Sequence, residues 1–171
     1  MKKRGQIAVE YIMIVAISLF IILPGIYLFR NFAFASNDNV LQSRLSEAAD
    51  SILSIGKEMY YYGPPSKSVK SLDMPSQISN MYILSTSDGK EYYLAFNFFT
   101  SSGSDTVLFE SDYPIKPVET VTCNFACQGI CECFPERYFT PGPKNFAVEA
   151  SKTCVGSSFC VLIKEISPEL N

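Results

Sequence analysis

Six cysteines are the residues of this chain best suited to chemistry, and all lie in its last third. They are Cys123, Cys127, Cys131, Cys133, Cys154 and Cys160. An even number of cysteines in a domain outside the cytoplasm indicates disulfides. Structural zinc sites use two close cysteine pairs, and the first four cysteines could form such a cluster, although no C-x-x-C occurs. The sequence favours disulfides, and a zinc or iron–sulfur site is the alternative.

The spacing suggests one pairing and leaves the others open. Cys154 and Cys160 flank a short turn and could bridge its two arms. The other four cysteines would then tie the loop at residues 124–134 in a pairing that the sequence does not determine.

Catalytic residues are hard to find elsewhere. The chain has no histidine, which excludes imidazole general-base catalysis and Cys-His nucleophile pairs. Glu110 and Asp112 resemble the paired carboxylates of a glycosidase, but solvation at the end of a strand explains them more simply. Glu132, Glu136 and Arg137 are interpreted as solvated loop charges. We therefore predict no catalytic site, no cofactor and no bound metal, and a protein that is not an enzyme.

The charge balance argues against nucleic-acid binding. Three of the 14 basic residues stand at positions 2–4, and everything after Gly5 carries 11 basic and 17 acidic side chains, a net charge of −6. Phosphate contacts need clustered lysine and arginine. The chain has 171 residues with 47% apolar content, enough for one membrane segment and one domain of roughly 100 residues.

A long apolar run near the start predicts a membrane helix. Ile7 to Phe29 forms a helix of about 34 Å, longer than a hydrocarbon core of about 30 Å, and Glu10 is its only charged residue. Basic residues precede the run and only Arg30 follows it closely, so the amino end should be cytoplasmic and the rest outside. The run is too long for a secretory signal peptide. Pro24 should bend or locally unwind the helix.

Beyond the run the pattern predicts an amphipathic helix and then short strands. After a polar, turn-prone segment at residues 36–39, one apolar stripe follows helical spacing: Leu41, Leu45, Ala48, Ile52, Ile55 and Met59. Strands are expected at residues 81–84, 92–99, 106–110, 146–150 and 159–166, the first two forming a hairpin across Asp88-Gly89. Phe96, Phe98 and Phe99 are predicted to be core or sheet-packing residues, with a ligand box as the alternative.

These elements predict an α+β fold. A long N-terminal helix, transmembrane in its first half, should pack on a small antiparallel β-sheet or β-sandwich head that contains disulfides.

Glu10 is the exception within the apolar run. Ionisable groups inside membranes are costly and usually functional, although this one lies near enough to the interface to be tolerated. Four features stand in order around it: a basic leader, a Gly-Gln dipeptide, a spaced Glu-Tyr pair and the uninterrupted run. The residues are Lys2, Lys3, Arg4, Gly5, Gln6, Glu10 and Tyr11.

This arrangement closely resembles the class III signal peptide of archaeal type IV pilin-like proteins. In that family a prepilin peptidase cuts between the glycine and the glutamine, which implies a mature chain that begins at Gln6. The family often has a hydroxyl residue where this chain has Ala8 and leucine where it has Ile12. The stretches Tyr60–Ser66 and Met74-Pro75 look like the family's junction between helix and head.

The resemblance implies four segments. Residues 1–5 are a leader, 6–35 a hydrophobic transmembrane and polymerisation helix, 36–62 its amphipathic second half, and 63–171 an extracellular β-rich head. Gln6, Glu10 and Tyr11 are then the assembly residues, and Glu10 meets the Gln6 amine of a neighbouring subunit.

The implied function is that of a structural subunit of a surface filament, with adhesion as its role. Its partners are copies of itself, the peptidase, the pilus assembly platform and the membrane, where the precursor has a cytoplasmic N-terminus and an extracellular head. Two alternatives remain: a monomeric membrane-anchored extracellular binding domain, and an extracytoplasmic cysteine metal-binding protein.

Overall fold

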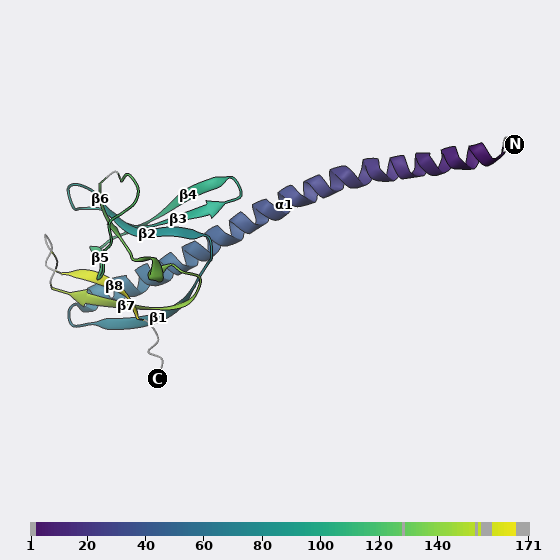
Figure 1. Ribbon diagram of the computed structural model, residues 1–171. Coiled ribbons are helices and arrows are strands. Elements are labelled where there is room, and N and C mark those ends of the chain that lie inside the picture. Colours follow the sequence, from purple (N-terminus) through teal and green to yellow (C-terminus); the bar gives the residue numbers. More distant parts are fainter. Residues whose placement is uncertain (1–2, 128, 153, 155–158, 167–171) are drawn as a thin grey trace. The chain divides into compact units, whose positions relative to one another are not determined.

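The computed structural model describes residues 3–127, 129–152, 154 and 159–166 (Figure 1). It forms two compact units, residues 1–40 and residues 41–171, which we call the N-terminal segment and the head. The helix α1 (Lys3–Tyr62) contributes to both. The head adds eight strands and one 3₁₀ turn: β1 (Lys67–Met74), β2 (Ile78–Ser85), β3 (Tyr92–Thr100), β4 (Gly103–Ser111), β5 (Ile115–Pro117), β6 (Ile130–Cys133), η1 (Glu136–Tyr138), β7 (Gly142–Ser151) and β8 (Cys160–Ile166).

The helix α1 is continuous over its described length. Pro24 lies inside it, and of the two effects expected there local unwinding does not occur. The polar, turn-prone segment at residues 36–39 is also helical, so the two expected halves of the helix are continuous. Extending an existing helix costs far less than nucleating a new one, which explains why weak capping residues do not break it.

The predicted apolar stripe is the helical part of the head's core. Four of its members are almost fully buried, and Met59 is 7% exposed. They share one cluster with side chains from both sheets. The buried stripe residues are Leu41, Leu45, Ala48, Ile52 and Met59. The helix is therefore held to the head by apolar burial along one face.

Two four-stranded sheets complete the core. Their strand orders are β1-β7-β8-β5 and β4-β3-β2-β6. Among the described residues all strand pairings are antiparallel except the short pairing of β5 with β8, which is parallel. The predicted α+β class, with a long N-terminal helix packed on antiparallel sheets and with disulfides, is confirmed.

The predicted hairpin is present as β2 and β3. Its turn is stabilised by the Thr86 hydroxyl, which donates to Asp88 Oδ1 at 2.6 Å, and Gly89 has a positive φ of 67°. Phe96 and Phe98 are buried, as expected. Phe99 is 60% exposed, so it is the one of the three that is not a core residue. Successive side chains of a strand alternate between faces, and Phe99 therefore faces away from its buried neighbour.

Three strands were not expected from the sequence. β1 is rich in lysine and serine, and β5 and β6 have three and four residues. Edge strands often carry lysine, which blunts unwanted pairing and weakens the apolar alternation. Such strands form because their neighbours β7, β8 and β2 supply the hydrogen bonds.

A tyrosine fastens the helix to the sheets. The Tyr113 hydroxyl donates a hydrogen bond to the Leu53 carbonyl at 2.6 Å, and the Tyr113 ring stacks on Tyr60 at 5.5 Å between centroids. The phenol lies over Gly56, where a Cβ atom would be 2.3 Å from the hydroxyl oxygen. Burial raises the pKa of Tyr113 well above its ordinary value near 10.

Candidate functional site

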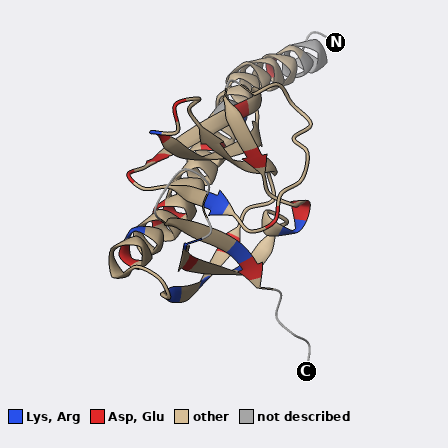
Figure 2. Ribbon diagram, turned by 90° about the vertical axis from the view of Figure 1, so that its left-hand side faces the viewer, with Lys and Arg blue, Asp and Glu red and all other residues tan. Residues whose placement is uncertain are grey.

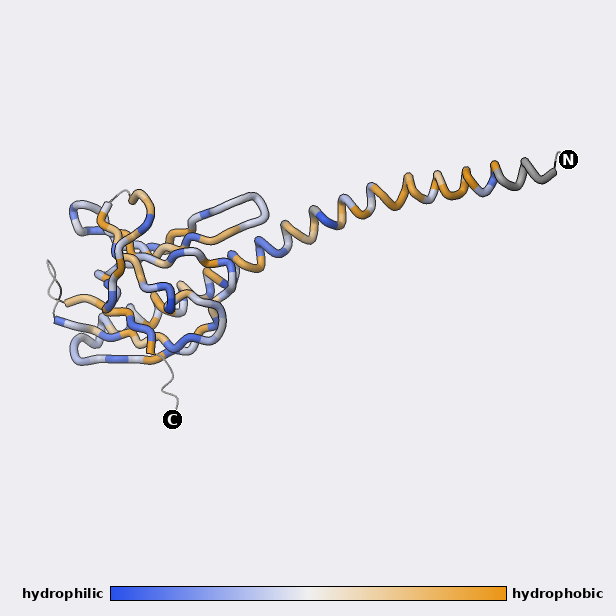
Figure 3. The backbone as a smooth tube through the Cα atoms, viewed as in Figure 1, coloured by the Kyte–Doolittle hydropathy of each residue, from blue (hydrophilic) through white to orange (hydrophobic). Residues whose placement is uncertain are grey.

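The N-terminal segment presents apolar side chains that the structure leaves unburied. Within the described residues one helix, α1 from Val9 onward, is long and apolar enough to cross a membrane, and none of its most apolar window is buried. Phe20 is 81% exposed, and other large apolar side chains remain exposed as far as Phe34. Figure 3 shows this half of α1 as a largely hydrophobic stretch. Such a surface is compatible with insertion into a membrane.

The residues predicted for processing and assembly occupy the start of this helix. Lys2 lies outside the described residues, whereas the backbone of Lys3, Arg4, Gly5 and Gln6 forms the first turns of α1. Glu10 and Tyr11 are exposed on the next turn. Gln6 and Glu10 are separated by about one turn of the helix.

The six cysteines are joined in three disulfides. The pairs are Cys123–Cys133, Cys127–Cys131 and Cys154–Cys160. The Cys154–Cys160 pair is the one that the spacing suggested. The other two disulfides are nested, one inside the other, in the segment that leads into β6 and in β6 itself. Since all six sulfurs are paired, none is a free thiolate, the form that binds zinc.

The nested disulfides cover the outer face of the sheet that contains β2, β3 and β6. Cys133 is buried, and Phe125 packs on Tyr82 with 4.8 Å between ring centroids. Ala95 belongs to the same small cluster. Burial by this loop raises the pKa of Tyr82. The cysteine-rich loop is thus a second, smaller core rather than an open binding site.

Two of the charges interpreted as solvated also take part in ion pairs. Arg137 contacts Glu119 and also lies 3.7 Å from Glu165, and Glu132 lies 3.4 Å from Lys116. Arg137 and Glu136 are both exposed, so their charges are solvated as interpreted, whereas Glu132 is only partly exposed within β6.

Glu165 is the buried carboxylate that sequence reasoning missed. It is 7% exposed, and its second cation is Lys144 at 3.4 Å. The alternation of β8 places Glu165 on the same face as Val161 and Ile163, which is the only signal that could have found it. A buried carboxylate between two cations is adequately explained by charge compensation.

The carboxylates Glu110 and Asp112 have different surroundings. Glu110 lies on β4, and Asp112 accepts a hydrogen bond from the Lys57 ammonium at 2.7 Å. That bond to Asp112 raises the pKa of Lys57. Asp112 therefore helps to attach α1 to the segment after β4, which supports a structural role.

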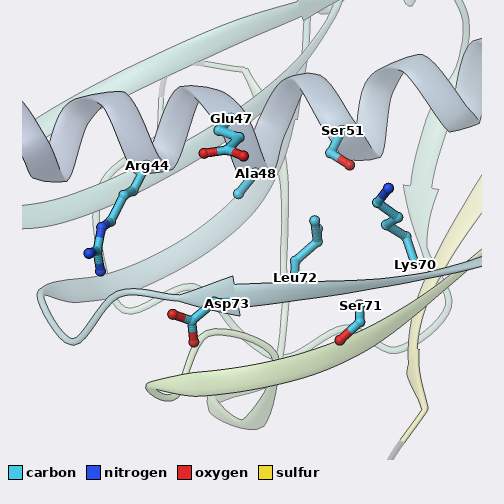
Figure 4. A pocket seen from close by; sticks show the side chains of 8 residues that line it. All are labelled: Arg44, Glu47, Ala48, Ser51, Lys70, Ser71, Leu72 and Asp73. Carbon is cyan, nitrogen blue, oxygen red and sulfur yellow. The ribbon is translucent and has the colours of Figure 1, made fainter.

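A cleft of about 330 Å³ lies between the head part of α1 and β1 (Figure 4). One wall is a single helical stripe and the other is a run of four strand residues. The stripe consists of Arg44, Glu47, Ala48 and Ser51, and the strand residues are Lys70, Ser71, Leu72 and Asp73. Acidic and basic residues are likewise interspersed over the rest of the head (Figure 2). The cleft was not predicted, because β1 was not.

Comparison of the chain with protein-family models, with curated proteins and with solved structures found no match. The chemistry and geometry of the described residues are therefore the basis for assigning a function.

Proposed function

We propose that this chain is a structural subunit of an archaeal type IV pilus-like surface filament. Its precursor is inserted in the membrane with a cytoplasmic N-terminus, and a prepilin peptidase cuts between Gly5 and Gln6. The mature subunit polymerises through the hydrophobic part of its helix, and the head decorates the outside and provides surfaces for adhesion.

The observation that supports this proposal is the contrast between the two units. The head buries its own apolar residues in a closed core, whereas the helix from Val9 to Phe34 leaves large apolar side chains exposed. A helix that is apolar on all sides needs lipid or other helices around it. In the precursor, lipid surrounds the apolar helix. In the filament, the corresponding helices of neighbouring subunits surround it.

Glu10 can set the axial offset between the helices of neighbouring subunits. In the precursor it lies near the cytoplasmic face and costs at most a few kcal/mol. In a filament the water around it is lost, and a buried carboxylate needs a cation. Cleavage supplies one, because it creates an α-amino group on Gln6. Within one helix that amine points along the axis, whereas a neighbour shifted along the filament can present it to Glu10.

The disulfides fit a head that folds outside the cytoplasm. Disulfides persist in oxidising compartments and are rare in the cytosol. Three of them lie in the head, which supports the orientation inferred from the basic residues that precede the apolar run.

Mass spectrometry of the mature N-terminus tests the proposal. We expect surface-exposed protein to begin at Gln6 and Gly5→Val to accumulate as the uncut precursor. Ala8→Val, a substitution of similar size outside the cleavage dipeptide, is the control and should mature normally. Surface protein that begins at Met1 or Lys2 would instead identify a membrane-anchored ectodomain.

A further inference from the structure

Each sheet of the head ends in one long strand that is paired on one side. In the described structure β1 is the terminal strand of the first sheet and β4 that of the second. They have eight and nine residues, and they lie on opposite sides of the head in Figure 1. The free edge of such a strand presents unpaired N–H and C=O groups, which are a template for pairing with another chain.

We propose that β1 of one subunit pairs antiparallel with β4 of a second copy. This contact would link the heads of successive subunits. The inference rests on the proposed function, because packing of the helices in a filament is what brings the heads together. Because the two strands are different surfaces on opposite sides of the head, the contact is heterologous, and along a filament it repeats as an open chain and not as a closed ring.

One register matches the side chains of the two strands pair by pair. It sets Lys67 opposite Glu110, Val69 opposite Leu108 and Ser71 opposite Thr106, all on the face turned away from the core. The first pair is oppositely charged, the second apolar and the third two hydroxyls. Each of these combinations stabilises antiparallel strands, by about 0.2–1 kcal/mol per pair.

Burial values agree with this register. Val69 is 53% exposed and Leu108 is 49% exposed, and each is an apolar residue on a free edge. The pairing would cover both at once. Lys67 already lies 3.8 Å from Glu149 of β7, so Glu110 of the second copy would complete a row of alternating charges across three strands.

The charges of the two edges are also complementary. β1 contains two lysines and one aspartate, whereas β4 contains Asp105 and Glu110 and no basic residue. In the proposed register Asp105 is the diagonal neighbour of Lys70, within reach of its long side chain.

The cleft beside β1 provides room for the incoming strand. Four consecutive residues of β1 line it, although successive side chains point to opposite faces. The cleft therefore lies beside the edge of β1, between that edge and α1. Its other wall is the α1 stripe, where Arg44 and Glu47 make no ion pair within the described part of the chain. They are thus available to polar groups of the entering backbone.

Cysteine cross-linking of the full-length chain tests the contact. Directly opposed residues have Cβ atoms about 4.5–5.5 Å apart, close to the separation that a disulfide spans. We expect the double variant Val69→Cys with Leu108→Cys to form a ladder of dimers, trimers and longer species after mild oxidation of assembled protein. Ser71→Cys with Thr106→Cys should give the same ladder, and each single variant should give none.

The control is Val69→Cys with Phe99→Cys, since Phe99 is as exposed as Leu108 but belongs to β3. An equal ladder from this control would overturn the proposal. The absence of a ladder from both in-register pairs would also overturn it, even where filaments form. A ladder in membranes from cells that form no filaments would support the contact and refute the proposed function.

Discussion

The attachment of α1 to the sheets at Gly56 allows a quantitative prediction. Gly56→Ala would ordinarily stabilise a helix by about 1 kcal/mol. Here the new methyl group would lie 2.3 Å from the Tyr113 hydroxyl oxygen. The ring must shift, although it is stacked on Tyr60 and its hydroxyl is bonded to Leu53.

The expected magnitude follows from three effects. Overpacking typically costs about 1–3 kcal/mol. The lost hydrogen bond between Tyr113 and Leu53 costs about 1 kcal/mol, and the gain in helix propensity of about 1 kcal/mol offsets that loss. We therefore expect Gly56→Ala to lower the free energy of unfolding of the head by about 1–3 kcal/mol. Denaturant titration of the full chain in detergent, followed by near-ultraviolet circular dichroism, measures this.

A double-mutant cycle identifies the cause. Tyr113→Phe alone should cost about 1 kcal/mol, but it removes the clashing oxygen and should recover part of the loss in Gly56→Ala. Gly25→Ala is the matched control, since a Cβ atom there meets nothing within 4 Å, and it should leave the stability of the head unchanged. A Gly56→Ala variant that is more stable than the parent, or effects that simply add, would refute the reasoning.

Two further predictions concern the head. Burial raises the folded-state pKa of Tyr113 above its ordinary value of about 10, so the contribution of this tyrosine to stability is fully present below about pH 10 and is lost as the pH rises toward the folded-state pKa. The free energy of unfolding should therefore fall more steeply above about pH 10 in the parent than in Tyr113→Phe. Equal slopes in the two proteins would contradict this prediction. The three disulfides should leave no thiol for labelling in the native protein, and six thiols that react without denaturant would contradict this. The double variant Cys123→Ser with Cys133→Ser should lower the free energy of unfolding by about 2–4 kcal/mol and expose Tyr82 to fluorescence quenchers.

The features predicted correctly from the sequence are those with strong local signals. The helix stripe from Leu41 to Met59 and the strands around Phe96 and Phe146 have a clear period and bury the expected residues. β1 lacked such a signal, because its lysines and serines form an edge whose partner, β7, is distant in sequence. The cleft beside it was missed for the same reason.

Other properties depended on distant contacts. The ion pairs of Arg137 join η1 to β8 and to the segment after β5, and no sequence spacing indicates them. The nested disulfides also needed the structure, because four cysteines allow three pairings. Phe99 shows the reverse case, where hydrophobicity suggested burial and the alternation of β3 exposes the side chain.

The most direct test of the account is the yield of filaments from a Glu10→Val variant. Removing one partner of a buried ion pair typically costs about 3–5 kcal/mol, which lowers an association constant roughly a thousandfold. We expect this variant to be inserted and cut normally but to form no filaments, and Glu10→Asp to be partly impaired. Glu136→Val, at an exposed site of the head, should assemble like the parent. Parental amounts of filaments from Glu10→Val would contradict the account.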